Sequence, residues 1–150
     1  MEKRQHYNNM YRDKLRHKIS LMEGTVFSRD NLSDAHSNRE QLRLNRALNA
    51  FMDEGLIIKI AHGLFAKAEP MRFPDGKVKP VLTVPFESVV MEALNKLGVK
   101  WEFGRAIRDY NEGKSTQVPV AFTVQLKSRF RGVIHAEGRH VIFEGGVNAR

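Results

Sequence analysis

Apolar residues recur at helical spacing near the start of the chain. The first stripe consists of Tyr11, Leu15, Ile19 and Met22. Spacings of four, four and three residues place these side chains on one face of a helix, which we expect to end at Gly24. A short, weakly patterned helix is expected to follow in the segment SRDNLSDAHS, with Ser28 as its N-cap.

The segment SNREQLRLNRALNAFMDEG carries the clearest helical pattern. It opens with Ser37-x-x-Glu40, a capping box in which each side chain can satisfy a backbone N–H of the first turn, and Gly55 ends it. At about 100° per residue, one face is apolar and comprises Leu44, Ala47, Leu48, Phe51 and Met52. The opposite face carries Arg39, Arg43 and Arg46, flanked by Asn38 and Asn49. We expect a third helix that buries one side and presents guanidinium groups on the other.

Two short apolar runs follow in the segment LIIKIAHGLFAKA. Ala61-His62-Gly63 separates them, and a glycine with positive φ suits a tight turn between antiparallel strands. The sequence thus predicts a hairpin after three helices, which is the order of a winged helix-turn-helix domain. We assign residues 8–68 to this domain.

The second half of the chain predicts a small helix-plus-antiparallel-sheet domain over residues 83–150. Residues 69–82 precede it and hold three of the five prolines and a Pro-Asp-Gly turn, which is typical of a linker. One helix is expected in PFESVVMEALNKLGV, another over 104–112, and a half-buried strand from Val118 to Leu126, where apolar and polar residues alternate. A hairpin turning at Glu137-Gly138 follows. The predicted fold class is α+β.

Charge narrows the classes of partner. The formal net charge is +8; residues 1–68 carry 12 Lys and Arg against 8 Asp and Glu, and residues 69–150 carry 13 against 9, which gives +4 in each part. Positive charge spread in this way favours binding to polyanions such as nucleic acid. The chain has no Cys, which excludes disulfides and thiolate metal sites, and it shows neither an apolar run of ~18 residues nor an apolar leader. We expect a cytoplasmic protein without a membrane partner.

Double-stranded DNA is the partner that the predicted fold and the charge favour together. In a helix-turn-helix domain the last helix enters the major groove, where Arg can bond guanine N7 and O6. The contacts predicted on this helix are Asn38, Arg39, Arg43, Arg46 and Asn49. The contacts predicted on the hairpin are Lys59, His62 and Lys67, and a patch that would steer the DNA backbone comprises Arg12, Lys14, Arg16 and Lys18. For each of these residues the competing interpretation is an ordinary solvated side chain.

One short motif points to a different chemistry. Gly113-Lys114-Ser115 matches the end of a phosphate-binding P-loop, but Arg108 occupies the position of its first glycine. A helix is expected before the motif and a strand after it, which reverses the order that a P-loop requires. We therefore expect Gly113 to end a helix and residues 114–117 to form an exposed turn.

The histidines give no clear metal site. They stand at positions 6, 17, 36, 62, 135 and 140, and only His135 and His140 are expected to face each other, across the last hairpin. Two ligands are too few for a zinc site. The sequence thus predicts a protein that is not an enzyme and has no metal or other cofactor.

Two stretches resemble a known family. ALNAFMDEGLIIKIAHGLFAKA is similar to the DNA-binding domain of AbiEi-type antitoxins of type IV toxin-antitoxin systems, and EALNKLGV followed by DYNEGKSTQVPV resembles a group of short AbiEi-related proteins. The resemblance extends over residues 10–145. It implies a transcription regulator that binds its own promoter, with the DNA contact on the helix at 38–54, and that opposes a nucleotidyltransferase-like toxin.

Other functions stay open on the sequence. The first domain could dock a protein in a toxin-antitoxin or phage-defence complex without specific DNA binding. The charge also permits RNA binding, although the chain has neither an RNP-like aromatic strand nor a GxxG loop. Nucleotide hydrolysis depends on Gly113-Lys114-Ser115 alone. No motif reveals the operator or the oligomeric state.

Overall fold

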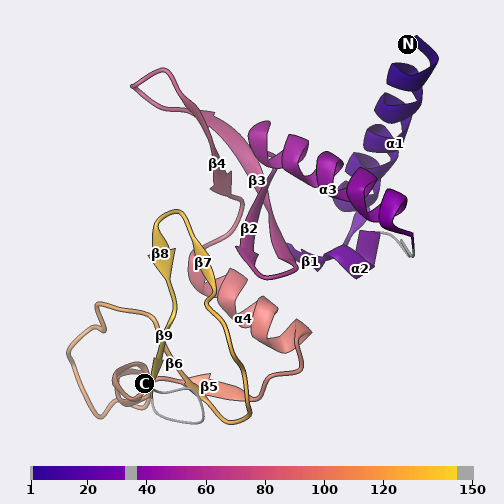
Figure 1. The fold of residues 1–150 in the computed structure, drawn as a ribbon. Helices are drawn as coiled ribbons and strands as arrows, with labels where there is room; N and C mark the ends of the chain where they lie inside the picture. The colour runs from indigo at the N-terminus through magenta and orange to yellow at the C-terminus, as the bar shows by residue number, and fades with distance from the viewer. Residues whose placement is uncertain (1, 33–36, 145–150) are drawn as a thin grey trace. The chain divides into compact units, whose positions relative to one another are not determined.

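The computed structural model describes residues 2–32 and 37–144, with side chains from residue 9 onward. Within these residues the chain forms five helices and nine strands, paired in sheets of four, three and two strands (Figure 1). The predicted α+β class is confirmed. The chain divides into two compact units, one of residues 1–59 with 63–83 and one of 60–62 with 84–150. In the described segments no helix combines the length and the apolar content needed to cross a membrane.

The first unit begins with three helices and a short strand. These are α1 Glu2–Leu21, β1 Val26–Ser28, α2 Arg29–Leu32 and α3 Asn38–Asp53. The Ser37 side chain accepts a hydrogen bond from the Glu40 N–H at 3.1 Å, which confirms the predicted N-cap of α3. At the start of α2, the Ser28 N–H donates to Asn31 Oδ1 at 2.9 Å. The predicted continuation of α2 over 33–36 lies outside the described residues.

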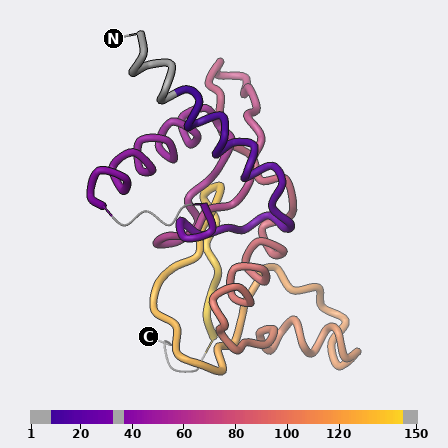
Figure 2. The backbone as a smooth tube through the Cα atoms, turned by 90° about the vertical axis from the view of Figure 1, so that its right-hand side faces the viewer, coloured from indigo at the N-terminus to yellow at the C-terminus, as the bar shows by residue number. Residues whose placement is uncertain are grey.

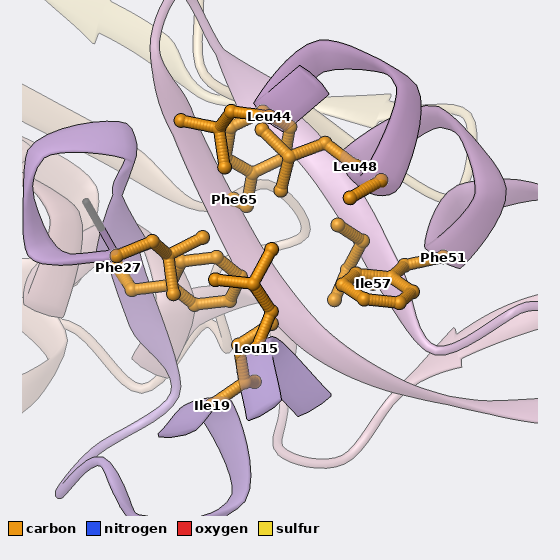
Figure 3. Close-up of a cluster of buried hydrophobic side chains, with 10 residues drawn as sticks. Leu15, Ile19, Phe27, Leu44, Leu48, Phe51, Ile57 and Phe65 are labelled. Carbon is orange, nitrogen blue, oxygen red and sulfur yellow. The ribbon is translucent and has the colours of Figure 1, made fainter. Parts of the chain in front are cut away.

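An apolar cluster joins α1, α3 and the strands of the first unit (Figure 3). Its buried members are Leu15, Ile19, Phe27, Leu32, Leu44, Ala47, Leu48, Phe51, Ile57 and Phe65. The rings of Phe27 and Phe65 stack with their centroids 5.7 Å apart. Burial of each large side chain contributes about 1.5–3 kcal/mol. The cluster therefore fixes which side of α3 faces inward.

The predicted hairpin after α3 is present as β2 Ile57–Ala61 and β3 Leu64–Arg72. Gly63 has a φ of 71° in the turn between them. β1, where the sequence predicted only a brief extended piece, pairs antiparallel with β3, so the strand order is β1-β3-β2. These three strands belong to the four-stranded sheet, and they pack against the helices of this unit.

Residues 69–82, which we expected to form a linker, form a second hairpin instead. The outer half of β3 pairs antiparallel with β4 Val78–Leu82, and Pro70 lies opposite Pro80. The Pro-Asp-Gly turn closes this hairpin, and its two arms run side by side up to the turn (Figures 1 and 2). Proline is compatible with an edge strand because its missing N–H removes no bond that the edge needs. Proline content alone therefore predicted the wrong structure for this segment.

The second unit contains two helices and two small sheets, one of three strands and one of two. Its elements are α4 Phe86–Lys96, β5 Trp101–Phe103, α5 Arg105–Asn111, β6 Thr123–Leu126, β7 His135–Ala136, β8 Arg139–His140 and β9 Ile142–Glu144. β6 pairs antiparallel with β5 but parallel with β9, so this sheet is mixed where we expected it to be antiparallel. The predicted turn joins β7 to β8, with Glu137 at φ 54° and Gly138 at φ 74°, as a type I′ turn requires.

The strand predicted from Val118 begins only at Thr123. Val118 is 64% exposed and Val120 is 100% exposed, although both were expected to point into the half-buried face. The partner strands β5 and β9 are three residues long each, so the ladder has no partner for the preceding residues. Pro119 also lacks the N–H that a paired strand would use. Alternation of residue types therefore overestimated the length of β6.

Candidate nucleic-acid interface

One side of α3 is open to solvent over most of its length. Its exposed side chains are Asn38, Arg39, Leu42, Arg46 and Asn49, which we call the outer face, and Asp53 in the last turn. They point outward because the apolar residues on the opposite side of the helix pack into the core cluster. Four of the five contact residues predicted on this helix lie in the outer face, and Leu42 is an addition that the sequence did not single out.

Arg39 and Arg46 are available for a ligand. Neither side chain forms a hydrogen bond or ion pair with another residue that the structure describes. Seven residues separate them, which is about 10.5 Å along a helix axis, close to three steps of ~3.4 Å along a nucleic-acid strand. Exposed Asp53 makes the C-terminal end of the helix less favourable to an anion. The outer face therefore suits a polyanion best over its first three turns.

Arg43 lies at the edge of the outer face, where we expected it to be fully presented. Its guanidinium carbon sits 3.8 Å from the centroid of the Tyr11 ring, and its side chain is half-buried. Burial raises the pKa of the Tyr11 hydroxyl, and the nearby Arg43 charge opposes that rise. This stacking ties α1 to α3, so Arg43 has a structural contact that Arg39 and Arg46 lack.

Arg29 reinforces the position of α3 in a way that the sequence did not reveal. From the start of α2 its guanidinium donates to the side-chain oxygens of Gln41 and Asn45. Gln41 and Asn45 are one helical turn apart, so their amide side chains lie on the same side of α3. These two amides near a basic residue were the only feature of the sequence that could have indicated the contact. The contact holds α2 against α3.

The cations of α1 divide into two groups. Arg16 bonds Asp13 at 2.7 Å and Glu54 at 3.1 Å, and Lys18 Nζ donates to the Leu32 carbonyl oxygen at 2.9 Å. These two side chains hold the helices of the unit together. Arg12 and Lys14 have no ion pair or side-chain hydrogen bond in the described residues. Of the four residues predicted to steer the DNA backbone, Arg12 and Lys14 are thus the two whose side chains have no such partner among the described residues.

The three cations predicted on the hairpin are also used differently. Lys67 Nζ donates to the Met22 carbonyl oxygen at 2.6 Å, close to the end of α1. Lys59 and His62 are exposed, His62 at the turn between β2 and β3. On the β3–β4 hairpin, which the sequence treated as a linker, Lys79 lies 3.8 Å from Asp75 and its Nζ lies 5.2 Å from the Phe73 ring centroid. Lys59 and His62 are thus the predicted hairpin residues that remain accessible.

The Gly113-Lys114-Ser115 motif forms a helix end in the second unit. The N–H groups of Lys114 and Ser115 both donate to the Asp109 carbonyl oxygen, at 2.8 and 3.2 Å. Lys114 Nζ bonds Glu112 at 2.9 Å, and this bond lowers the pKa of the Glu112 carboxyl and raises the pKa of Lys114. The backbone groups that would wrap a phosphate in a P-loop are therefore committed to α5.

Other charged side chains of the second unit form ion pairs with one another. Arg139 donates to Glu87 at 2.6 Å, which lowers the pKa of that carboxyl, and Lys127 and Arg108 both reach Glu102. His135 and His140 are opposite each other in the β7–β8 register, as predicted. No group of three or more His, Asp or Glu side chains suited to a metal occurs in the part of the chain that the structure describes.

Comparison of the chain with protein-family models, with curated proteins and with solved structures finds no match. The geometry of the outer face and its surroundings is therefore the basis for a functional assignment.

Proposed function

We propose that the protein is a DNA-binding transcription regulator of the antitoxin type, which reads duplex DNA with the outer face of α3. In this proposal residues 8–68 are a winged helix-turn-helix domain. α3 is its recognition helix, and the β2–β3 hairpin is its wing.

The order of elements in the first unit is the main support. The chain runs α1, β1, α2, α3, β2, β3, and the strands are arranged β1-β3-β2. Three helices followed by a hairpin, with the last helix packed on its apolar side, leave the polar side of that helix for the major groove. The side chains of Arg39 and Arg46 stand on that polar side; they are exposed and have no hydrogen bond or ion pair within the part of the chain that the structure describes.

The resemblance to AbiEi-type antitoxins supports the biological part of the proposal. It falls on residues 47–68, which include the end of α3 and the hairpin, on residues 92–99 at the end of α4, and on residues 109–120, which join α5 to β6. On this basis the protein represses its own operon and opposes a nucleotidyltransferase-like toxin. Its partners are then duplex DNA and the toxin, and the protein itself catalyses no reaction.

A gel-shift titration of the full chain on the duplex upstream of its own reading frame tests the DNA contact. We expect Arg39→Ala/Arg46→Ala to weaken binding about ten- to a hundredfold and to reduce the slope of log K against log salt by about one to two. Arg43 is left unchanged because its loss would disturb the contact with Tyr11.

A charge-matched control removes two exposed cations from the second unit, as Lys96→Ala/Lys100→Ala. We expect this variant to keep most of the parent's affinity, and circular dichroism should show both variants folded. If the two double variants bind the duplex as tightly as the parent, α3 does not read DNA.

One observation favours a protein-docking function, through the second unit and not through the first domain. Val118 and Val120 are exposed on the connection between α5 and β6, where the chain resembles the short AbiEi-related proteins. Exposed apolar residues on a loop are typical of a partner-binding segment. In this alternative the protein co-purifies with the product of the neighbouring gene, and Val118→Asp/Val120→Asp abolishes that complex. DNA affinity that does not fall linearly with log salt would also favour docking over DNA recognition.

A further inference from the structure

We propose that Leu42 is a base-reading residue of α3, which contacts the C5-methyl group of a thymine in the bound DNA. The inference rests on the proposed function, because it requires the outer face to enter the major groove. The proposed function was argued from positive charges. The Leu42 contact adds a residue that would determine the DNA sequence that is bound.

Leu42 lies at the centre of the outer face. At about 100° per residue, Asn38 and Asn49 fall within about 40° of it on one side, and Arg46 and Arg39 within about 60° on the other. Its side chain is 55% exposed and does not belong to the core cluster. The helix thus places one large apolar side chain in the middle of a polar, cationic surface.

Among the described residues, Leu42 belongs to no apolar cluster that would hold α3 in place. Gln, Lys and Glu form helices about as well as Leu, so helix formation does not require an apolar residue here. Isolated exposed leucines are common on protein surfaces. Leu42 differs from such residues because all its neighbours on the outer face have side chains that can reach base edges or phosphates.

The major groove contains one apolar group that such a residue can recognise. Thymine presents its C5-methyl there, whereas the other major-groove features of the four bases are hydrogen-bond donors and acceptors. Arg39 and Arg46 stand about 4.5 and 6 Å along the axis on either side of Leu42. When these arginines bond guanine or phosphate, Leu42 faces the base pair between them. The geometry therefore points to a thymine flanked by the two arginine contacts.

Removal of single methyl groups from DNA tests this contact. The full chain first selects duplexes from a random pool, and each thymine of the enriched duplex is then replaced in turn by uracil, which lacks only the methyl group. We expect one or two positions at which uracil weakens binding by the parent about three- to tenfold. Leu42→Ala should lose a similar factor on the thymine duplex and should lose nothing more when uracil is introduced there.

Leu21→Ala is the matched control, because Leu21 is also an exposed leucine on a helix of the same unit, at 68% exposure. We expect this variant to retain the uracil sensitivity of the parent. The inference is overturned if uracil has no effect at any position, or if Leu42→Ala remains as sensitive to uracil as the parent.

Failure of the proposed function gives a different result. In that case the pool yields no enriched duplex, or Arg39→Ala/Arg46→Ala binds the enriched duplex as tightly as the parent. If Leu42→Ala leaves all DNA affinities unchanged while the arginine variant loses binding, the proposed function stands and the thymine contact is wrong.

Discussion

α3 and α5 end in the same local structure. In α3 the Gly55 N–H donates to Met52 O at 3.1 Å, and the next N–H donates to Phe51 O at 2.9 Å. In α5 the corresponding bonds, from Gly113 to Tyr110 and from Lys114 to Asp109, measure 3.2 and 2.8 Å. Both are Schellman motifs, in which a glycine with positive φ allows the chain to turn back and satisfy the last carbonyls. A Glu-Gly pair stands at each helix end.

The surroundings of the two helix ends are different. A Cβ atom added at Gly55 would lie 2.9 Å from Pro70 Cβ, whereas one added at Gly113 would meet no heavy atom within 4 Å. The residue after Gly55 is the partly buried Leu56, which packs against the core cluster, and the residue after Gly113 is the exposed Lys114. The same motif thus fixes the end of α3 into a core in one place and ends a surface helix in the other.

Among the variants that test this comparison, Gly55→Ala is expected to have the largest effect on the free energy of unfolding. A φ of 79° costs an alanine about 1–2 kcal/mol, and the clash with Pro70 adds about 1–3 kcal/mol. We therefore expect the free energy of unfolding to fall by about 2–5 kcal/mol, measured by urea denaturation. Gly113→Ala has a similar φ of 77° in open space and should lose only about 1–2 kcal/mol. Equal losses in the two variants would show that Pro70 moves aside at little cost.

The two glutamates that precede these glycines offer a second, smaller test. Glu54 accepts from Arg16, 38 residues away in the sequence, whereas Glu112 bonds Lys114, two positions away. Arg16 also lies over the Phe51 ring, 5.2 Å from its centroid, so its contact joins α1 to the end of α3. We expect Glu54→Gln to reduce the free energy of unfolding by about 0.2–1 kcal/mol, the range of partly exposed ion pairs.

Glu112→Gln is the matched variant and should leave the free energy of unfolding unchanged within error, since that pair is fully solvated. The Arg16 contact is isolated by a double-mutant cycle with Arg16→Ala and Glu54→Gln. Additive losses in the cycle would mean that the ion pair contributes nothing to the position of α3.

Local signals predicted the helix ends and tight turns of this chain well. Ser37 with Glu40, Gly55, Gly63 and Glu137-Gly138 each lie where the sequence placed them, because capping and positive φ depend on a few adjacent residues. These signals carry no information about what lies across the fold. The sequence therefore predicted both Schellman glycines but not the approach of Pro70 to Gly55.

The errors arise where a pattern depends on a distant partner. Val120 follows the alternation of a strand, but no partner strand extends to it, and residues 69–82 pair despite their prolines. Among the predicted site residues, Arg39 and Arg46 are exposed as expected, whereas Arg43 contacts Tyr11 and Lys67 contacts Met22. Counting charges on a helix does not show which of them already have a partner. The availability of a cation for DNA is a property of tertiary structure.

The smallest expected effect is on the pKa of Glu112. Its hydrogen bond from Lys114 lowers this pKa in the folded chain, so the pair favours folding above the unfolded carboxyl pKa, and that contribution is lost as pH falls through the folded value. The raised pKa of Lys114 sets the upper limit of the pH range in which the pair favours folding. Its contribution to stability is lost as pH rises through the pKa of Lys114 in the folded chain. An NMR titration of the carboxyl should therefore show its pKa rise towards 4.5 in Lys114→Ala. Because this pair is fully exposed, the accompanying loss of stability near neutral pH should lie within the error of a denaturation experiment.

The same titration separates a helix end from a nucleotide site. In the capped turn, Lys114 is bonded to Glu112 and the neighbouring N–H groups are bonded to Asp109, so addition of Mg-ATP should leave the Glu112 titration unchanged. In a P-loop, the lysine would leave the carboxylate for the phosphates, and the pKa of Glu112 would rise in the parent as it does in Lys114→Ala. A rise on addition of nucleotide would return Gly113-Lys114-Ser115 to the functional residues, whereas an unchanged pKa leaves it with the role that Gly55 has in α3, the end of a helix.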